Sequence, residues 1–366
     1  MSSDTYRPLF MIAAFPPPVH GAAVITAMMA EAVAARSKVV VLNIGPDGLQ
    51  RGLRYHLTRI FRVVAALVRV AAGGFGGNRG AIYLTTAGGL GNLYNIALAL
   101  EARLLARSLY IHHHSFAYLD RWDWKMSLLA RVAGSHACHL MLCPTMEQRL
   151  RSNYRMVAHT RVLSNAAFYR PPAELTARRV NGARLRVGFL SNLHRDKGLD
   201  LVFATAAAAG DTIERLVLAG APIDRDAEAM IAAAAATLGT RLDYRGVVYG
   251  EAKARFFAEI DVFLFPSRYA NESEPIVVYE ALSAGVPVIA YSRGCISCQL
   301  PTGGGLVVMP DDDFVAAACA QIKGWSQDAN EWGRASHRAL EGMRSAHEQS
   351  RMALAEVVAG FGGDRD

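Results

Sequence analysis

The chain has 366 residues, 52% of them hydrophobic, which is enough to fill the cores of two domains. It contains no uncharged apolar run of about 18 residues, so the sequence predicts no membrane-spanning helix. The short apolar run near the N-terminus follows an acidic residue and precedes three prolines, which favours a first strand over a signal peptide. Five cysteines without a framework pattern indicate a reducing, cytoplasmic compartment.

The formal net charge of +7 is distributed unevenly. Residues 1–170 contain 19 Lys and Arg against 7 Asp and Glu, whereas residues 171–366 contain 20 against 25. A basic N-terminal half predicts an anionic partner such as nucleic acid, an anionic membrane surface or a phosphorylated acceptor. We expect no nucleic acid, because the sequence shows no basic patch with interleaved aromatic residues and no known binding motif.

Arginines recur at helical spacing among apolar residues over 51–70. A helix of this kind can lie on a membrane surface. It can equally dock on its own domain and leave a basic face in solvent, and the sequence does not decide between the two.

Apolar strands alternate with helices in chain order, which is typical of doubly wound α/β domains. In the first half we expect strands at 9–15, 38–44, 80–86, 108–114 and 139–145, and helices at about 22–35, 53–72, 92–107, 122–133 and 145–152. In the second half we expect strands at 185–191, 215–221, 242–248, 262–267 and 287–292, and helices from about 312 to 361. Periodicity is lost near 166–182, which predicts an N-terminal domain over 1–168, a C-terminal domain over 182–340 and a last helix within 341–366.

The segment 262–294 places two carboxylates beside a predicted helix start. Pro275 suits the first turn of a helix over about 275–284, and Ser273 or Glu274 could cap it. The N–H groups of Ile276 and Val277 would then point toward the end of the preceding strand and favour a diphosphate. Carboxylates repel phosphate, so Glu272 and Glu280 suit hydroxyl groups of a sugar and a ribose better. Glu274 and Glu280 could also be ordinary helix-start and solvent-facing charges.

This segment resembles the signature of family-4 retaining glycosyltransferases of GT-B fold. In that signature two glutamates separated by seven residues follow Pro-Ser and precede Ala-Gly-x-Pro-Val-Ile, as Glu272 and Glu280 do here. Further matching motifs occur in the same order: PPPVHGAA at 16–23, IHHHSF at 111–116, VLSNAAFYRP at 162–171, VGFLSNLHRDKG at 187–198, LVLAGAP at 216–222 and DYRGVVYGEAKARFFAEIDVFLFPS at 243–267. The resemblance implies two Rossmann-like domains facing across a cleft, with the acceptor on the first and the nucleotide sugar on the second. It also implies that the last helix crosses back to the N-terminal domain.

The resemblance implies roles for individual residues. Glu280 matches the residue that binds the ribose, Glu272 the residue beside the donor sugar, and Lys197 the lysine that neutralises the donor diphosphate. The family usually has an arginine five residues before that lysine, where this chain has Asn192, and Arg195 is a candidate to compensate. Whether the site turns over or only binds is left open by this difference.

Other implied contacts are less specific. Gly21 would let backbone N–H groups approach the donor phosphates, with His20 adjacent, and Val247 and Val248 would hold the base through main-chain contacts. A histidine at the end of a strand near the donor sugar is placed at His114, with His113 as the alternative.

No metal or cofactor is expected. Strand alternation puts His112 and His114 on one face and His113 on the other, so the three cannot converge on one ion. The resemblance implies no divalent metal either. Cys295 and Cys298 form a C-x-x-C without a second ligand pair nearby, so we interpret them as structural or incidental.

The sequence thus predicts a cytoplasmic retaining glycosyltransferase that is peripheral on the inner face of the membrane. It would move a hexose-type sugar from a UDP- or GDP-linked donor to a lipid-linked or glycan acceptor in surface polysaccharide biosynthesis. The alternative is a non-catalytic nucleotide-sugar or glycan-binding protein of the same fold.

Overall fold

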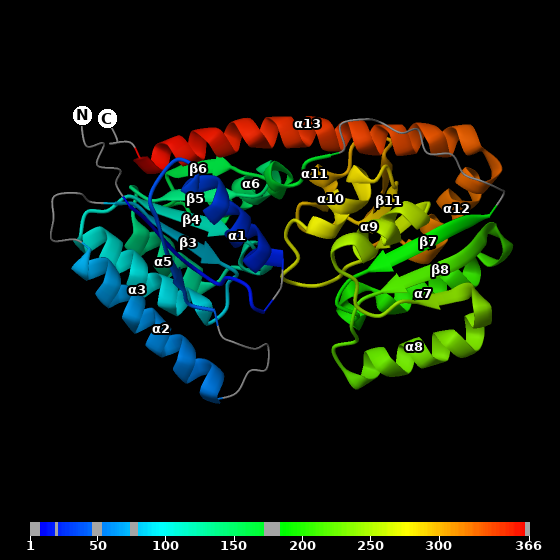
Figure 1. Ribbon diagram of the computed structural model, residues 1–366, viewed down its shortest axis with the longest axis horizontal. Coiled ribbons are helices and arrows are strands. Elements are labelled where there is room, and N and C mark those ends of the chain that lie inside the picture. Colours follow the sequence, from blue (N-terminus) through cyan, green and yellow to red (C-terminus); the bar gives the residue numbers. More distant parts are fainter. Residues whose placement is uncertain (1–7, 19–20, 46–52, 74–79, 172–183, 363–366) are drawn as a thin grey trace. The chain divides into compact units, whose positions relative to one another are not determined.

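The computed structural model describes residues 8–18, 21–45, 53–73, 80–171 and 184–362 (Figure 1). The chain divides into two compact units, one of residues 1–168 with 349–366 and the other of residues 169–348. Each unit is built on a six-stranded parallel sheet with flanking helices. The predicted fold class, two Rossmann-like doubly wound domains, is confirmed. No helix among the described residues is long and apolar enough to cross a membrane.

The N-terminal unit has the strand order β2-β1-β3-β4-β5-β6. Its strands are β1 (Leu9–Ala13), β2 (Val39–Asn43), β3 (Ile82–Thr86), β4 (Leu109–His113), β5 (Cys138–Met141) and β6 (His159–Val162). The first five contain the apolar runs that predicted them. β6 was not predicted, because this edge strand is half polar and pairs only with β5.

Helices cover both faces of this sheet (Figure 1). On one face, α1 (Gly21–Ala34) and the end of α13 (Ala329–Gly362) pack on a core that includes Met11, Tyr83 and Phe361. Alternation turns Phe10 to the opposite face, where it meets Gly73 at the end of α2 (Leu53–Ala72). On that face α2 packs beside α3 (Gly91–Leu104), and α3 packs beside α5 (Trp124–Ala133). The short α4 (Ala117–Asp120) and α6 (Pro144–Asn153) complete the unit.

The C-terminal unit has the strand order β12-β11-β10-β7-β8-β9. Its strands are β7 (Leu185–Leu190), β8 (Ile213–Ala219), β9 (Leu242–Tyr244), β10 (Val262–Phe265), β11 (Val288–Tyr291) and β12 (Gly305–Val308). Its helices are α7 (Leu199–Ala208), α8 (Arg225–Leu238), α9 (Gly250–Glu259), α10 (Ile276–Ser283), α11 (Ile296–Gln299), α12 (Phe314–Gln327) and the first part of α13. β12 was not predicted from its short, glycine-led run.

The order of these strands creates a switch point between β7 and β10. From β7 the chain proceeds outward to β8 and β9, and from β10 it proceeds to β11 and β12 on the other side. The loops after β7 and β10 therefore leave the carboxyl edge of the sheet in opposite directions. Such a position is where open parallel sheets bind ligands.

Candidate functional site

Two loops meet at the switch point of the C-terminal sheet. The loop after β7 contains the short turn Arg195–Lys197, and the loop after β10 runs from Pro266 to Pro275. The Arg268 N–H donates to the Asp196 carbonyl at 2.7 Å. Gly198 has φ +84°, and a Cβ there would lie 2.3 Å from the Pro266 carbonyl oxygen. Only glycine permits this approach, so the backbone itself holds the two loops together.

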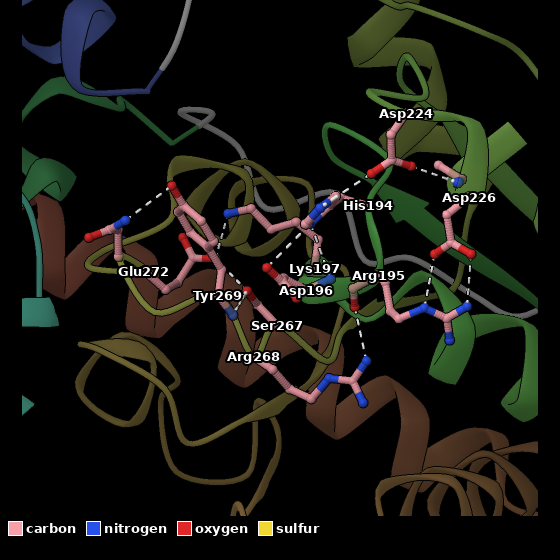
Figure 2. A network of polar contacts seen from close by, with 12 residues as sticks. His194, Arg195, Asp196, Lys197, Asp224, Asp226, Ser267, Arg268, Tyr269 and Glu272 are labelled. Atoms are coloured by element: carbon pink, nitrogen blue, oxygen red, sulfur yellow. Dashed lines mark hydrogen bonds and ion pairs between the residues drawn. The ribbon is translucent and has the colours of Figure 1, made fainter. Parts of the chain in front are cut away.

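Lys197 and Glu272 come together where the loops touch (Figure 2). The Lys197 Nζ lies 2.7 Å from the Glu272 Oε2, and the buried Ser267 hydroxyl donates to the same oxygen at 2.6 Å. Glu272 is itself buried, with 7% of its surface exposed. The Oε1 of Glu272 takes part in no hydrogen bond or ion pair among the residues the structure describes, so it can accept a bond from a ligand hydroxyl.

Neighbouring groups fix the geometry of this pair. The ammonium of Lys197 lies 4.5 Å from the centre of the Tyr269 ring, which is within cation–π distance. A turn closed by the Glu272 N–H and the Tyr269 carbonyl, 3.0 Å apart, orients the glutamate. Beyond it, the Cys295 N–H donates to the Ser273 carbonyl at 2.7 Å, next to Gly294 at φ +62°. The carboxylate therefore sits on backbone that is held from both sides.

The helix start beside this pair is α10, whose first residues are Ile276 and Val277. Its N-cap is Pro275, and no side chain caps the helix. The prediction of Ser273 or Glu274 as the cap was therefore wrong. Glu274 is buried and accepts instead from the Tyr279 hydroxyl at 2.8 Å. Because no side chain caps the first turn, its N–H groups can donate hydrogen bonds to an anion.

Glu280 lies on α10 and has a partner that the sequence did not reveal. The Lys253 ammonium on α9 donates to the Glu280 carboxylate. Burial raises the pKa of the Tyr169 phenol, and the charge of Glu280 raises it further. Glu280 is thus a half-buried anion beside one cation and one neutral phenol. Lys253 lies 27 residues from Glu280 in the sequence, and no local pattern connects them.

Arg195 does not join Lys197 and Glu272. Its guanidinium forms a two-pronged contact with Asp226 (Figure 2), with distances of 2.9 and 3.1 Å, and it also lies 3.7 Å from Asp200. The hydrogen bonds to Asp226 and the charges of both carboxylates raise the pKa of Arg195 above its usual value. Asn192 is exposed in the preceding stretch of the same loop. The expectation that Arg195 compensates for the missing arginine is therefore not supported by the position of its side chain.

The remaining predicted donor contacts in this unit lie after β9. Val247 is exposed and Val248 half-buried in the loop between β9 and α9, and the predicted strand 242–248 ends at Tyr244. The Gly220 N–H donates to the Gly246 carbonyl at 2.7 Å, which ties this loop to the one after β8. Both loops leave the same edge of the sheet as the Lys197 loop.

The N-terminal unit contains the other predicted site residues. Gly21 is exposed at the first position of α1, whereas His20 lies outside the described residues. His114 follows β4, is buried, and donates its backbone N–H to the Thr86 carbonyl at 2.8 Å. Its ring lies beside that of His112, with centroids 4.2 Å apart.

His113 faces away from these two rings and joins a buried network. Its Nδ1 lies 2.7 Å from the Tyr118 hydroxyl and its Nε2 lies 2.9 Å from the His139 Nδ1. Burial lowers the pKa of His113 well below the usual range and lowers that of His139 to about 4. Both imidazoles are therefore neutral at pH 7. Among the described residues, no group of three or more His, Cys, Asp or Glu side chains has the geometry of a metal site.

Comparison with known proteins agrees with this architecture. Residues 184–328 match the family model of glycosyl transferases group 1. Sucrose-phosphate synthase (tll1590) from Thermosynechococcus elongatus is 18% identical and superposes with a TM-score of 0.74, covering 97% of this chain and 99% of that one. Anabaena Alr3699/HepE in complex with UDP is 15% identical, with a TM-score of 0.73 over 97% of this chain and 100% of that one.

A third similar structure is WaaG, a glycosyltransferase involved in lipopolysaccharide biosynthesis. It is 13% identical, with a TM-score of 0.62 over 98% of this chain and 100% of that one. A sequence comparison with curated proteins gives no match. The resemblance drawn from the sequence motifs is thus confirmed in two respects: residues 184–328 match the family model of glycosyl transferases group 1, and the chain as a whole has the GT-B fold.

Proposed function

We propose that this protein is a retaining, metal-independent glycosyltransferase that uses a nucleotide diphosphate sugar. The observation that carries the proposal is the buried Lys197–Glu272 pair beside the uncapped start of α10, at the switch point of the C-terminal sheet. Two structures of the same fold hold UDP and UDP-glucose, which favours a UDP-linked donor and makes it the first to test.

The groups at the switch point can each bind a different part of the donor. The N–H groups of Ile276 and Val277 and the ammonium of Lys197 would hold the diphosphate. An ammonium has three N–H donors, so Lys197 can contact a phosphate while it still holds Glu272. Glu272 would accept from hydroxyl groups of the donor sugar, and Glu280 from those of the ribose. Val247 and Val248 would contact the base.

The chemistry follows from the charges that this arrangement supplies. When the bond between the anomeric carbon and the diphosphate breaks, negative charge develops on the leaving phosphate and positive charge on the sugar ring. Lys197 and the start of α10 stabilise the first, and Glu272 stabilises the second. The acceptor hydroxyl attacks from the side that the phosphate leaves, and its proton passes to that phosphate. No side-chain nucleophile is needed, and the configuration at the anomeric carbon is retained.

The acceptor and the cellular location are finer parts of the proposal. The N-terminal unit would bind a lipid-linked or glycan acceptor, with His114 and Gly21 contributing contacts near the donor. The excess of Lys and Arg in residues 1–170 supports an anionic acceptor or surface. We place the enzyme in the cytoplasm, where sugar nucleotides are made, on the inner face of the membrane and in the synthesis of surface polysaccharide.

The test is release of nucleotide diphosphate from a panel of UDP- and GDP-linked sugars, with and without acceptors. Turnover that falls at least about a hundredfold in Glu272→Ala supports the site. Glu214→Ala is the control, because it removes an exposed carboxylate on β8 that pairs with Arg215 and contacts neither Lys197 nor Arg195. Release of nucleotide at the same rate in Glu272→Ala would contradict the assignment of the site.

A second candidate function is favoured by one observation. Asn192 stands where the family has an arginine, and the nearby Arg195 is occupied by Asp226. With one cation fewer at the diphosphate, the protein could bind a nucleotide sugar or glycan without transferring it. Binding of a donor with no turnover for any acceptor would support this alternative. Asn192→Arg would then be expected to raise turnover.

A further inference from the structure

Three neighbouring helices of the N-terminal unit carry apolar side chains on the side away from their sheet. In α2, Val63, Ala66 and Val70 are buried against the sheet. Leu57, Phe61, Val64 and Val68 lie on the opposite side of the same helix and are exposed. A helix needs only one apolar stripe in order to pack on a sheet, so folding of the unit does not explain the second.

The same arrangement recurs in the next two helices. In α3 the exposed Leu93, Leu100 and Leu104 lie opposite the buried Leu98 and Ala102, at spacings of seven and four residues. In α5 the exposed Trp124 and Leu128 lie opposite Met126 and Leu129. We name the combined surface the outer helix face; its exposed large apolar residues are Leu57, Ile60, Phe61, Val64, Val68, Leu90, Leu93, Leu100, Leu104, Trp122, Trp124 and Leu128.

Exposed large hydrophobic side chains are concentrated on this face. The outer helix face holds twelve of the twenty large hydrophobic side chains that are exposed among the described residues. In the N-terminal unit α2 packs beside α3, and α3 packs beside α5 (Figure 1), so we infer that the three stripes adjoin one another. Contiguous exposed apolar patches on folded proteins mark surfaces that bind a partner or a membrane.

The charge of the three helices indicates which kind of partner this face binds. Their sequences contain seven Lys and Arg residues and one acidic residue, Glu101. Arg69, Arg103 and Arg131 are exposed among or beside the apolar stripes. Trp122 and Trp124 are also exposed, and tryptophan favours the boundary between headgroups and acyl chains. A second copy docked through the same face would bring like charges together, which disfavours a symmetric dimer.

We propose that the outer helix face docks on an anionic lipid surface, with its apolar side chains in the headgroup boundary and its arginines on lipid phosphates. Such surfaces combine burial of apolar area with attraction to anionic headgroups. The proposal does not depend on glycosyl transfer, since docking needs neither a donor nor turnover. It assigns the membrane contact to three helices, of which the arginine pattern in the sequence indicated one.

The test is co-sedimentation of the full chain with vesicles of phosphatidylcholine alone or mixed with an equal part of phosphatidylglycerol. We expect binding to the mixed vesicles that weakens with added salt, and little binding to the neutral ones. Phe61→Ser and Leu104→Ser remove side chains that are 73% and 77% exposed, so the fold should tolerate them. Each should lower the vesicle partition coefficient at least about tenfold.

Matched controls separate this face from the rest of the molecule. Met352→Ser on α13 removes a side chain that is 65% exposed outside the face and should leave binding unchanged. Arg69→Gln should lower binding about fivefold at low salt, whereas the exposed Arg225→Gln on α8 should not change it. Absence of binding to anionic vesicles, or equal binding by all variants, would overturn the proposal. Self-association that Phe61→Ser abolishes would also overturn it and assign the face to a second copy.

Discussion

Each unit gathers a group of polar side chains in and around its sheet, but the two groups differ in charge. In the N-terminal unit, His113, Tyr118 and His139 are buried and bond to one another in neutral form. In the C-terminal unit, Lys197 forms an ion pair with Glu272, and Lys253 forms one with Glu280. The neutral side chains bond to one another, and only the buried His139 Nε2 of this group has no hydrogen-bond partner among the described residues. The charged group keeps donors and acceptors that a ligand can share.

A buried group of polar side chains therefore does not by itself mark a binding site. The neutral network has the burial and hydrogen bonding of a structural core, and its loss should affect folding first. The charged pairs lie beside an uncapped helix start, and their loss should affect binding and turnover first. Variants of the two groups should therefore differ in whether they lose stability or lose binding and turnover.

The largest effect is expected for Lys197→Ala. Removing the ammonium deprives the leaving diphosphate of its cation, so turnover should fall by a factor of about 10² to 10³ in steady-state assays of nucleotide release. Lys323→Ala, at an exposed position on α12, is the control. Equal turnover in Lys197→Ala and the control would remove this lysine from the site.

The neutral network predicts a loss of stability in acid. Burial lowers the pKa of His139 to about 4, so the folded state binds fewer protons than the unfolded state below the ordinary histidine pKa. The contribution of this group to stability is therefore intact above about pH 6.5 and declines as the pH falls toward 4, by up to about 3 kcal/mol. Denaturant unfolding of the wild type and of His139→Leu across this range is the measurement. An equally steep pH dependence in both would contradict the assignment.

Tyr118→Phe should cost stability without affecting the donor. It removes the hydroxyl that lies 2.7 Å from the His113 Nδ1 and leaves a buried nitrogen without that bond. We expect a loss of about 1 to 3 kcal/mol in the free energy of unfolding. Donor affinity, measured by calorimetry on the folded variant, should stay unchanged. A weakened donor affinity would show that the two groups are coupled.

The smallest effect is expected for Lys253→Met. The variant leaves Glu280 in place but removes the cation that orients it, so donor affinity should fall about fivefold, which corresponds to roughly 1 kcal/mol. Turnover at saturating donor should change little, because this pair serves the ribose and not the reacting bond. Arg255→Met, at an exposed position on the same helix, is the control. A drop in saturated turnover larger than the loss of affinity would place Lys253 closer to the chemistry.

Much of the fold was accessible from the sequence because buried parallel strands are continuous apolar runs. Ten of the twelve strands were predicted, most of them from such runs, whereas β6 was missed because half of its residues are polar and β12 because its run is short and begins with glycine. The loop and helix that hold Glu272 and Glu280 were also predicted, since both lie in one segment.

Contacts between distant segments were not accessible in this way. Lys253 pairs with Glu280 although the two residues lie 27 positions apart in the sequence, and Arg195 pairs with Asp226 across 31 positions. These pairs form only because the chain folds. The Ser267 hydroxyl, five residues before Glu272, was missed although it lies in the same loop. The second apolar stripes of α2, α3 and α5 became visible only when burial showed which side of each helix faces the sheet.

The central claim is that the switch point of the C-terminal sheet holds the donor diphosphate between Lys197 and the start of α10. A crystal structure of the protein soaked with a UDP-sugar tests it most directly. We expect phosphate oxygens within hydrogen-bonding distance of the Lys197 Nζ and of the Ile276 and Val277 N–H groups, with sugar hydroxyls at Glu272. A donor bound elsewhere, with Lys197 still bonded only to Glu272, would contradict it.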